Sequence, residues 1–360
     1  MSRFSARRKG YFYRVIQQFG SRFWINNPSI KEVKLAIKAG AVGCTTNPTY
    51  AMRLLEKEEE HDTVINLIKA AVDNCSDDRQ AAQWVYRMLI KRIIPYFKDI
   101  YKQFSGNEGF VTLQVDPVLE QDYEYIVNES LINRTFGPNV MMKIPVTHAG
   151  LEAIRQLVPQ KVPIMATEVM SLSQAIRACE VYTEACEASK VYPPFFLAHI
   201  SGAFDDYIWA RAMVENIDID PRILDQAGCI IARRQFKVLH ERNYPITFLG
   251  GGAKKLYHFT ELVGGPMHLT INWEGTADTL LSNDPPLVDR LHIEEPPEVL
   301  RELLEKVKDF RRAYEHDGLD ESEFAYFGPV VLFRNSFING WDYLIEQIRN
   351  VRMGTDIKQD

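Results

Sequence analysis

Residues 139–170 read NVMMKIPVTHAGLEAIRQLVPQKVPIMATEVM, and they contain a strand, a helix and a second strand in succession. The apolar runs 140–144 and 162–166 are short, as is typical of buried strands. Between them, Thr147 is placed to cap a helix whose apolar residues recur every three or four positions. A strand–helix–strand unit of this kind predicts two parallel strands of one sheet.

The same alternation continues on both sides of this unit. Ser29 is expected to cap a helix that ends near Gly40, and Ser171 is expected to open the helix after the fifth strand. Eight strands alternating with helices predict an α/β protein with a (β/α)8 TIM barrel, and an open doubly wound sheet is the alternative. The predicted strands are 23–25, 42–45, 110–115, 140–144, 162–166, 194–198, 246–249 and 267–271.

The composition of the chain changes after the eighth strand. We expect a single barrel domain over 1–360, with an N-terminal arm at 1–20, a barrel core at about 21–275 and a helical C-terminal extension at about 276–360. The extension contains a charged helical segment at 298–316, a segment at 324–337 and an amphipathic helix around 341–348. We expect it to pack on the barrel; an oligomer contact is the alternative, so a homo-oligomer remains open.

The composition also indicates which kinds of partner the protein can be expected to bind. The formal net charge of −6 gives no reason to expect nucleic acid. No apolar run approaches the roughly 18 residues that suggest a membrane span. The five cysteines show no CxxC spacing, which argues against a disulfide framework and favours a reducing, cytoplasmic location. The basic start MSRFSARRKGYFYR lacks an apolar signal core, so we interpret it as a solvated arm rather than a transit peptide.

Lys143 is the most informative of the polar residues at the predicted strand ends, where barrel enzymes carry their active sites. It lies inside the apolar run MMKIP, and burial would lower the pKa of its amine. A neutral amine can attack a carbonyl and form an imine. The alternative, that the side chain extends from the strand end to solvent, is equally open at this point.

Three motifs resemble one enzyme family. Residues 141–157 (MMKIPVTHAGLEAIRQL) resemble the Schiff-base segment of transaldolases and fructose 6-phosphate aldolases, and its lysine falls on Lys143. Residues 41–50 (AVGCTTNPTY) resemble the TTNP turn of that family, with Asn47 on its asparagine. Residues 166–175 (ATEVMSLSQA) resemble the fifth-strand motif, with Thr167 on its threonine. The three motifs occur in the family's order and on predicted strand ends.

The resemblance implies a class I aldol mechanism without metal or cofactor. Lys143 would form an imine with a ketose, the C3–C4 bond would break, and an aldehyde would take up the dihydroxyacetone unit. Asn47 would hold substrate hydroxyls, and Thr167 with Gln114 would hold the water of imine formation. The implied partners are sugars or sugar phosphates of carbohydrate metabolism, such as those of the pentose phosphate pathway. We also assign substrate binding to Thr46, Ser201, Gly252 and Lys254.

The sequence departs from the family pattern at two places. Asn26 stands where the family carries the aspartate that moves a proton during C–C cleavage, and a carboxamide cannot do this near neutral pH. Glu168 is a candidate substitute, but adjacent strand residues point in opposite directions, so we expect it to contact a neighbouring helix.

The second departure concerns phosphate. Ala203 stands in place of the family's phosphate-binding arginine, while Gly252 replaces a serine and Lys254 keeps a basic residue. His199 is expected to line the same pocket. We therefore expect a weakened or reshaped phosphate site.

Other catalytic patterns are absent from the sequence, among them the GxxxxGK[ST] loop, HExxH and the GxSxG turn. The favoured function is a transaldolase-like transferase. A lyase that releases the fragment, or a homologue acting on a modified sugar, is the close alternative. A catalytically impaired barrel acting as a sensor or structural partner is the alternative of another class.

Overall fold

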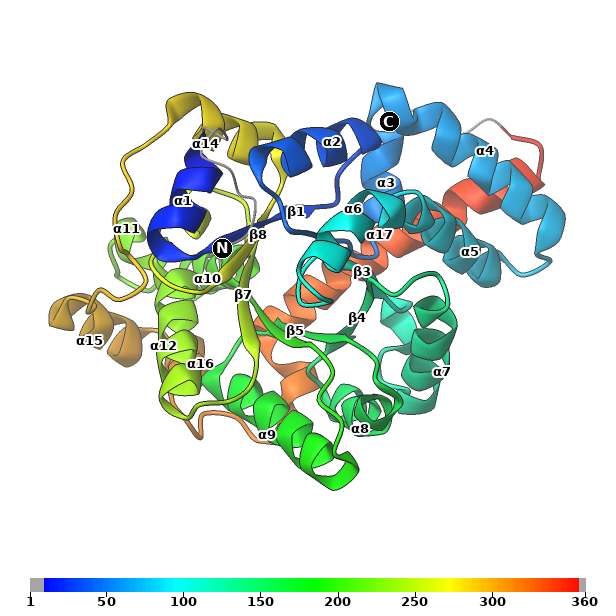
Figure 1. Cartoon of the computed structure of the whole chain (residues 1–360). Coiled ribbons are helices and arrows are strands. Elements are labelled where there is room, and N and C mark those ends of the chain that lie inside the picture. Colours follow the sequence, from blue (N-terminus) through cyan, green and yellow to red (C-terminus); the bar gives the residue numbers. More distant parts are fainter. Residues whose placement is uncertain (1–9, 356–360) are drawn as a thin grey trace.

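The computed structural model describes residues 10–355, and its centre is a closed barrel of eight parallel strands in sequential order (Figure 1). All eight predicted strands are confirmed, with ends that differ by a few residues. The strands are β1 (Arg22–Asn26), β2 (Gly43–Thr45), β3 (Val111–Gln114), β4 (Val140–Pro145), β5 (Ile164–Val169), β6 (Phe195–Ile200), β7 (Thr247–Ala253) and β8 (His268–Ile271).

Helices surround the barrel and follow the strands along the chain (Figure 1). Those up to the fifth strand are α1 (Tyr11–Phe19), α2 (Ile30–Ala39), α3 (Tyr50–Leu55), α4 (Glu58–Asn74), α5 (Asp78–Lys91), α6 (Ile94–Gln103), the short η1 (Pro117–Leu119), α7 (Tyr123–Arg134), α8 (His148–Leu157) and η2 (Val158–Gln160). Those after it are α9 (Leu172–Ser189), α10 (Ser201–Val214), α11 (Pro221–Leu224), α12 (Ala227–Glu241), α13 (Tyr257–Thr260), η3 (Trp273–Ala277), α14 (Asp278–Asn283), α15 (Pro297–Lys306), α16 (Lys308–Tyr314), η4 (Glu321–Tyr326) and α17 (Gly328–Arg352).

The predicted helix starts are confirmed by their capping contacts. Ser29 accepts a hydrogen bond from the backbone of Glu32, whose carboxylate accepts one from the backbone of Ser29, so both free N–H groups are satisfied. Thr147 and Ser171 cap α8 and α9 through the same kind of side-chain contact. Gly40 ends α2 in the left-handed conformation.

Aromatic rings fill the part of the barrel interior away from the strand ends that carry the site. The indole of Trp24 donates a hydrogen bond to Nδ1 of His268 at 2.9 Å. Burial lowers the pKa of His268 to about 3, so its ring is neutral and can accept that bond. A Cβ at Gly43 would lie 2.5 Å from the Trp24 ring, so β2 can pass this ring only with glycine there. The packed interior leaves the carboxyl ends of the strands as the place for a ligand.

The N-terminal segment is not a solvated arm, so that prediction is wrong for the residues described. Residues 11–19 form α1, and the ring of Phe12 stacks on Phe23 of β1 with centroids 4.1 Å apart. Tyr11, Phe12 and Val15 are buried, because aromatic residues at helical spacing bury one face of the helix against the barrel. Residues 1–9 lie outside the described part.

The C-terminal extension packs on the barrel as expected, but its division differs. The charged segment breaks at Val307 into α15 and α16, and a single long helix, α17, replaces the two predicted pieces after residue 324. α17 contacts β5, α3, α5 and α10, so it crosses the end of the barrel rather than one flank (Figure 1).

Two simpler features complete the fold. The five cysteines at 44, 75, 179, 186 and 229 are free thiols. In the part of the chain that the structure describes, no helix combines the length and hydrophobicity that a membrane crossing requires.

Candidate functional site

Lys143 projects from β4 into the barrel instead of extending to solvent. Its residue is 5% exposed, and its Nζ lies 5.5 Å from the ring centroid of Phe337 on α17. Burial lowers the pKa of the amine to about 8, and the nearby negative charge of Glu168 opposes this shift. At pH 7 about one tenth of the amine is therefore unprotonated, far more than at the ordinary pKa of 10.5, and this neutral form is the nucleophile.

A cavity of about 90 Å³ opens over Lys143 at the carboxyl ends of the strands. Five of the residues assigned to the site from the sequence line it: Asn26, Asn47, Lys143, Gly252 and Lys254. Polar residues that the sequence reasoning missed also line it: Thr45, Arg53, Thr270 and Asn272. Phe333 of α17 is part of the wall, so the C-terminal extension contributes to the cavity.

A hydrogen-bonded network fixes the amide of Asn26 at the end of β1. Its Nδ2 donates to Oδ1 of Asn272 at 2.9 Å, and its Oδ1 accepts from the hydroxyl of Thr45 at 2.9 Å. Thr270 Oγ1 lies 2.6 Å from the same hydroxyl oxygen of Thr45. The position opposite Lys143 is thus polar but holds no acid.

Asn47 is oriented by its own turn. Its Oδ1 accepts from the backbone N–H and the hydroxyl of Thr49 and from Nδ2 of Asn27, at 3.0, 2.7 and 3.1 Å. Since these donors occupy its oxygen, the amide nitrogen is the group left to meet a ligand.

Glu168 turns toward Lys143, against the expectation that it would face a neighbouring helix. The register between β5 and β6 shifts between Ala166 and Val169, and Glu168 has a φ of 60°. This irregularity breaks the alternation of side-chain directions on which the expectation rested. The carboxylate is buried, and its Oε1 accepts a hydrogen bond from Nε2 of Gln114 at 3.1 Å. A left-handed φ at a non-glycine residue costs on the order of 1–3 kcal/mol and recurs at functional sites.

Burial raises the pKa of Glu168 to about 7, while the charges of Lys143 and Arg334 lower it. Gln114 lies beside Lys143 in the sheet register, and Thr167 precedes Glu168 on β5. Three buried atoms here have no hydrogen-bond partner among the described residues: Gln114 Oε1, Thr167 Oγ1 and Glu168 Oε2. Buried polar atoms without a protein partner are the kind that bind water molecules.

A second buried carboxylate lies behind Glu168. Glu120 is 1% exposed, and its Oε1 lies 3.5 Å from Nη1 of Arg334 on α17. Burial and the charge of Glu168 raise the pKa of Glu120 well above its usual value, and Arg334 opposes this. Neither Glu120 nor Arg334 was identified from the sequence, because neither belongs to a motif near a strand end.

Gln114, Thr167 and Glu168 are not among the residues that line the cavity, and three other predicted residues do not line it either. Thr46 donates its hydroxyl to the carbonyl of Thr112 at 2.6 Å and so holds β2 against β3. Ser201 is buried at the start of α10, outside the cavity lining. Both ring nitrogens of His199 face backbone carbonyls, of Val169 at 2.9 Å and of Gly228 at 3.0 Å, so this ring is a structural contact.

The region expected to bind phosphate is only partly basic. Ala203 is buried in α10 at the arginine position. Lys254 lines the cavity, but its ammonium pairs with the carboxylate of Asp206. This end of β6 and β7 therefore offers little uncompensated positive charge.

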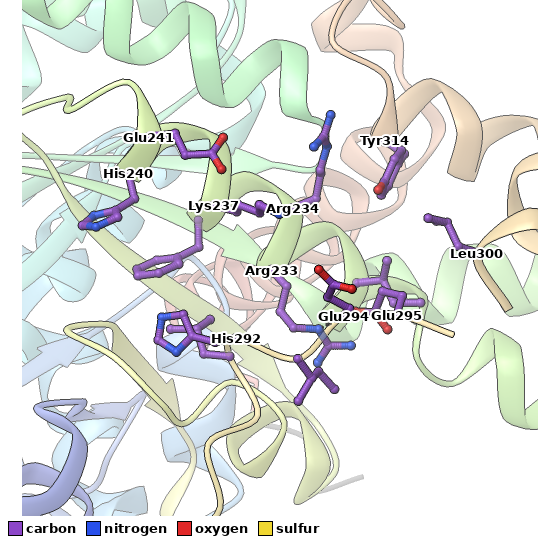
Figure 2. A pocket seen from close by; sticks show the side chains of 14 residues that line it. Arg233, Arg234, Lys237, His240, Glu241, His292, Glu294, Glu295, Leu300 and Tyr314 are labelled. Atoms are coloured by element: carbon purple, nitrogen blue, oxygen red, sulfur yellow. Dashed lines mark hydrogen bonds and ion pairs between the residues drawn. The ribbon is translucent and has the colours of Figure 1, made fainter. Parts of the chain in front are cut away.

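A larger groove, of about 460 Å³, lies away from Lys143 (Figure 2). Its wall combines α12 with residues 291–295 and Tyr314, and it places Arg233 against Glu295. None of the assigned site residues lines it, and its wall contains both acidic and basic side chains. In addition, no three His, Cys, Asp or Glu side chains within residues 10–355 converge in a group that could hold a metal ion.

Comparison with known proteins agrees with this geometry. The sequence profile described as Transaldolase/Fructose-6-phosphate aldolase matches residues 23–317, which includes all eight strands of the barrel apart from Arg22 at the start of β1. The chain belongs to the transaldolase/fructose-6-phosphate aldolase family. The resemblance predicted from three motifs is thereby confirmed, and an enzyme of the aldolase or transferase class is supported.

Individual relatives within the family are distant. A transaldolase of Saccharopolyspora erythraea is 28% identical over 187 residues, which are 49% of this chain and 49% of the relative. One of Helicobacter pylori is 26% identical over 168 residues, 45% of this chain and 50% of the relative. One of Trichodesmium erythraeum is 23% identical over 343 residues, 82% of this chain and 87% of the relative. The chain thus spans about half the length of several curated transaldolases that it matches.

Proposed function

We propose that this family member is a transaldolase-type enzyme that transfers a dihydroxyacetone unit between sugar phosphates through an imine on Lys143. The observation that carries the proposal is a buried amine with a pKa of about 8 in a polar cavity at the carboxyl end of the barrel. The relatives named transaldolase support the same reaction class.

Imine formation begins when the neutral Lys143 amine attacks C2 of a ketose. The resulting carbinolamine loses its hydroxyl group as water, and the protonated imine remains. Because the imine withdraws electrons, the C3–C4 bond can break once the proton of the C4 hydroxyl is removed. The bonding electrons then form an enamine of the three-carbon unit, and an aldehyde leaves. Attack of the enamine on another aldehyde, followed by addition of water to the imine, regenerates the amine.

Glu168 is suited to exchange protons with the water of imine formation. Its pKa of about 7 lies near neutral pH, where a general acid and base is most effective. By the resemblance, Gln114 stands where transaldolases carry a glutamate and fructose 6-phosphate aldolases a glutamine, and it donates a hydrogen bond to the Glu168 carboxylate. In this proposal Glu168 supplies the carboxyl group for imine formation, and Gln114 and Thr167 position it and the water.

For cleavage of the C–C bond, the cavity offers no carboxylate that could remove the proton of the C4 hydroxyl. No Asp or Glu is among the residues that line the cavity, and Asn26 cannot accept a proton near neutral pH. We therefore expect imine formation to be efficient and cleavage of ordinary substrates to be slow. This observation also keeps open a sensor that binds ketoses covalently without turnover.

A screen of ketose donors with aldehyde acceptors tests the proposal. Wild type should form the transferred ketose from fructose 6-phosphate and an aldehyde acceptor, and Lys143→Met should lose this activity. Release of free dihydroxyacetone without transfer would identify a lyase. Full activity of Lys143→Met would overturn the proposal.

A further inference from the structure

Three cations line the cavity, and they differ in whether their charge is compensated. Lys143 is buried with a lowered pKa, and Lys254 pairs with Asp206. Arg53, on the first turns after the TTNP motif, has no ion pair with any residue in the described part of the chain. A guanidinium stays charged at any pH relevant to proteins. The uncompensated positive charge of the cavity is therefore that of Arg53.

Arg53 is held at one end and free at the other. Its Nε donates to Oγ1 of Thr49 at 3.3 Å, and this hydroxyl in turn donates to Oδ1 of Asn47 at 2.7 Å. The two terminal Nη groups make no hydrogen bond within residues 10–355. The chain of contacts leaves Nη of Arg53 and Nδ2 of Asn47 as donors on one side of the cavity.

Neighbouring acids form no ion pair with Arg53 among the described residues. A neighbouring cavity is also lined by Asn26 and Arg53, and its other lining residues include Glu32, Glu56 and Glu274. Glu32 and Glu274 both face Lys57, at 2.6 and 3.7 Å. Glu56 is exposed on the same turn as Arg53 and forms no ion pair within the described residues.

We propose that Arg53, with Nδ2 of Asn47, binds the phosphate group of the substrate, so that the anion lies beside β1 and β2 instead of beside β6 and β7. The inference rests on the proposed function, since it names where that reaction's sugar phosphate is anchored. A planar guanidinium with two free N–H groups is matched to a phosphate, which accepts two parallel hydrogen bonds.

Calorimetric titration with inorganic phosphate tests the proposal directly. Arg53→Gln should weaken phosphate binding at least about ten-fold, as expected for the loss of charge-assisted hydrogen bonds. Arg301→Gln is the matched control, because Arg301 is an exposed arginine on α15 with no contact to the cavity. Lys254→Gln should have a smaller effect than Arg53→Gln. Unchanged binding in Arg53→Gln, or no phosphate binding by wild type, would overturn the proposal.

A kinetic comparison separates this proposal from the proposed function. Arg53→Gln should raise KM for fructose 6-phosphate about ten-fold and leave KM for unphosphorylated fructose unchanged. Equal effects on both sugars would count against an anion site at Arg53, while the imine mechanism would stand. If wild type formed no imine with either sugar, the proposed function would fail, and the phosphate titration would still decide the role of Arg53.

Discussion

At the scale of single residues, the charge of the Lys143 amine depends on two opposing effects. Burial favours the neutral form, and the carboxylate of Glu168 favours the ammonium. The buried position gives the larger effect, so the pKa lies at about 8 instead of 10.5.

Replacement of Glu168 by glutamine should therefore lower the pKa of the Lys143 amine. In wild type, the rate of imine formation should rise with pH through a midpoint near 8. In Glu168→Gln the midpoint should shift to lower pH, because the charge that raises the amine pKa is gone. The rate at high pH should fall by about 10²–10⁴-fold if the carboxylate is a general acid and base. Glu124→Gln, an exposed substitution on α7, should leave the profile unchanged; an identical profile in Glu168→Gln would contradict its role.

Restoring an acid at residue 26 tests whether the asparagine that replaces the family's aspartate slows C–C cleavage. Asn26→Asp should increase C–C cleavage, measured as release of the aldehyde product, because Thr45 can still donate to a carboxylate at this position. General acid–base catalysis of this kind contributes about 10²–10⁴-fold, so a gain of at least ten-fold is expected. Absence of any gain would mean that another group already moves this proton.

The sequence predicted the site unevenly, and the reason differs from residue to residue. Lys143, Asn26 and Asn47 were placed correctly at the cavity because they end strands or follow them directly. Glu168 was misplaced because a local register shift, invisible in the apolar pattern, reverses the direction of its side chain. Arg53 carries no motif signal, since its role depends on which neighbours compensate its charge.

At the scale of elements, the alternation of strands and helices could be predicted because the buried parallel strands are short apolar runs. The helix caps at Ser29, Thr147 and Ser171 were also predictable, since capping depends on a few adjacent residues. The C-terminal helices could not be divided correctly. Gly328 and Pro329 begin α17, and its length then depends on packing across the barrel end.

The passage of β2 over Trp24 gives a test of the barrel packing. Gly43→Ala would place a methyl carbon 2.5 Å from the indole ring, so either the ring or the strand must move. The free energy of unfolding, measured with urea, should fall by about 1–3 kcal/mol, as for other overpacked cores. A variant as stable as wild type would show that the ring relaxes without cost.

At the scale of the whole molecule, α17 joins the C-terminal extension to the buried carboxylates of the barrel. Arg334 is the cation that faces both Glu120 and Glu168, whose pKa values are raised by burial. An acid with a raised pKa in the folded state takes up a proton on folding. Its contribution to stability is therefore present at low pH and is lost as the pH rises through the folded-state pKa.

Arg334→Met should increase the loss of stability that occurs as the pH rises. The difference in unfolding free energy between wild type and the variant should be small near pH 5 and reach about 3 kcal/mol near pH 8, because the buried Glu168 carboxylate then ionises without its cation. Arg301→Met, on the exposed face of α15, should show no such trend. A pH-independent difference would mean that Arg334 stabilises the fold by packing alone.

The most direct test of the central claim is borohydride reduction in the presence of fructose 6-phosphate, followed by peptide mass spectrometry. The predicted result is one ketose-derived adduct on Lys143, formed faster at pH 8 than at pH 6 and absent from Lys143→Met. An adduct on another lysine, or none at either pH, would contradict an imine mechanism at this residue.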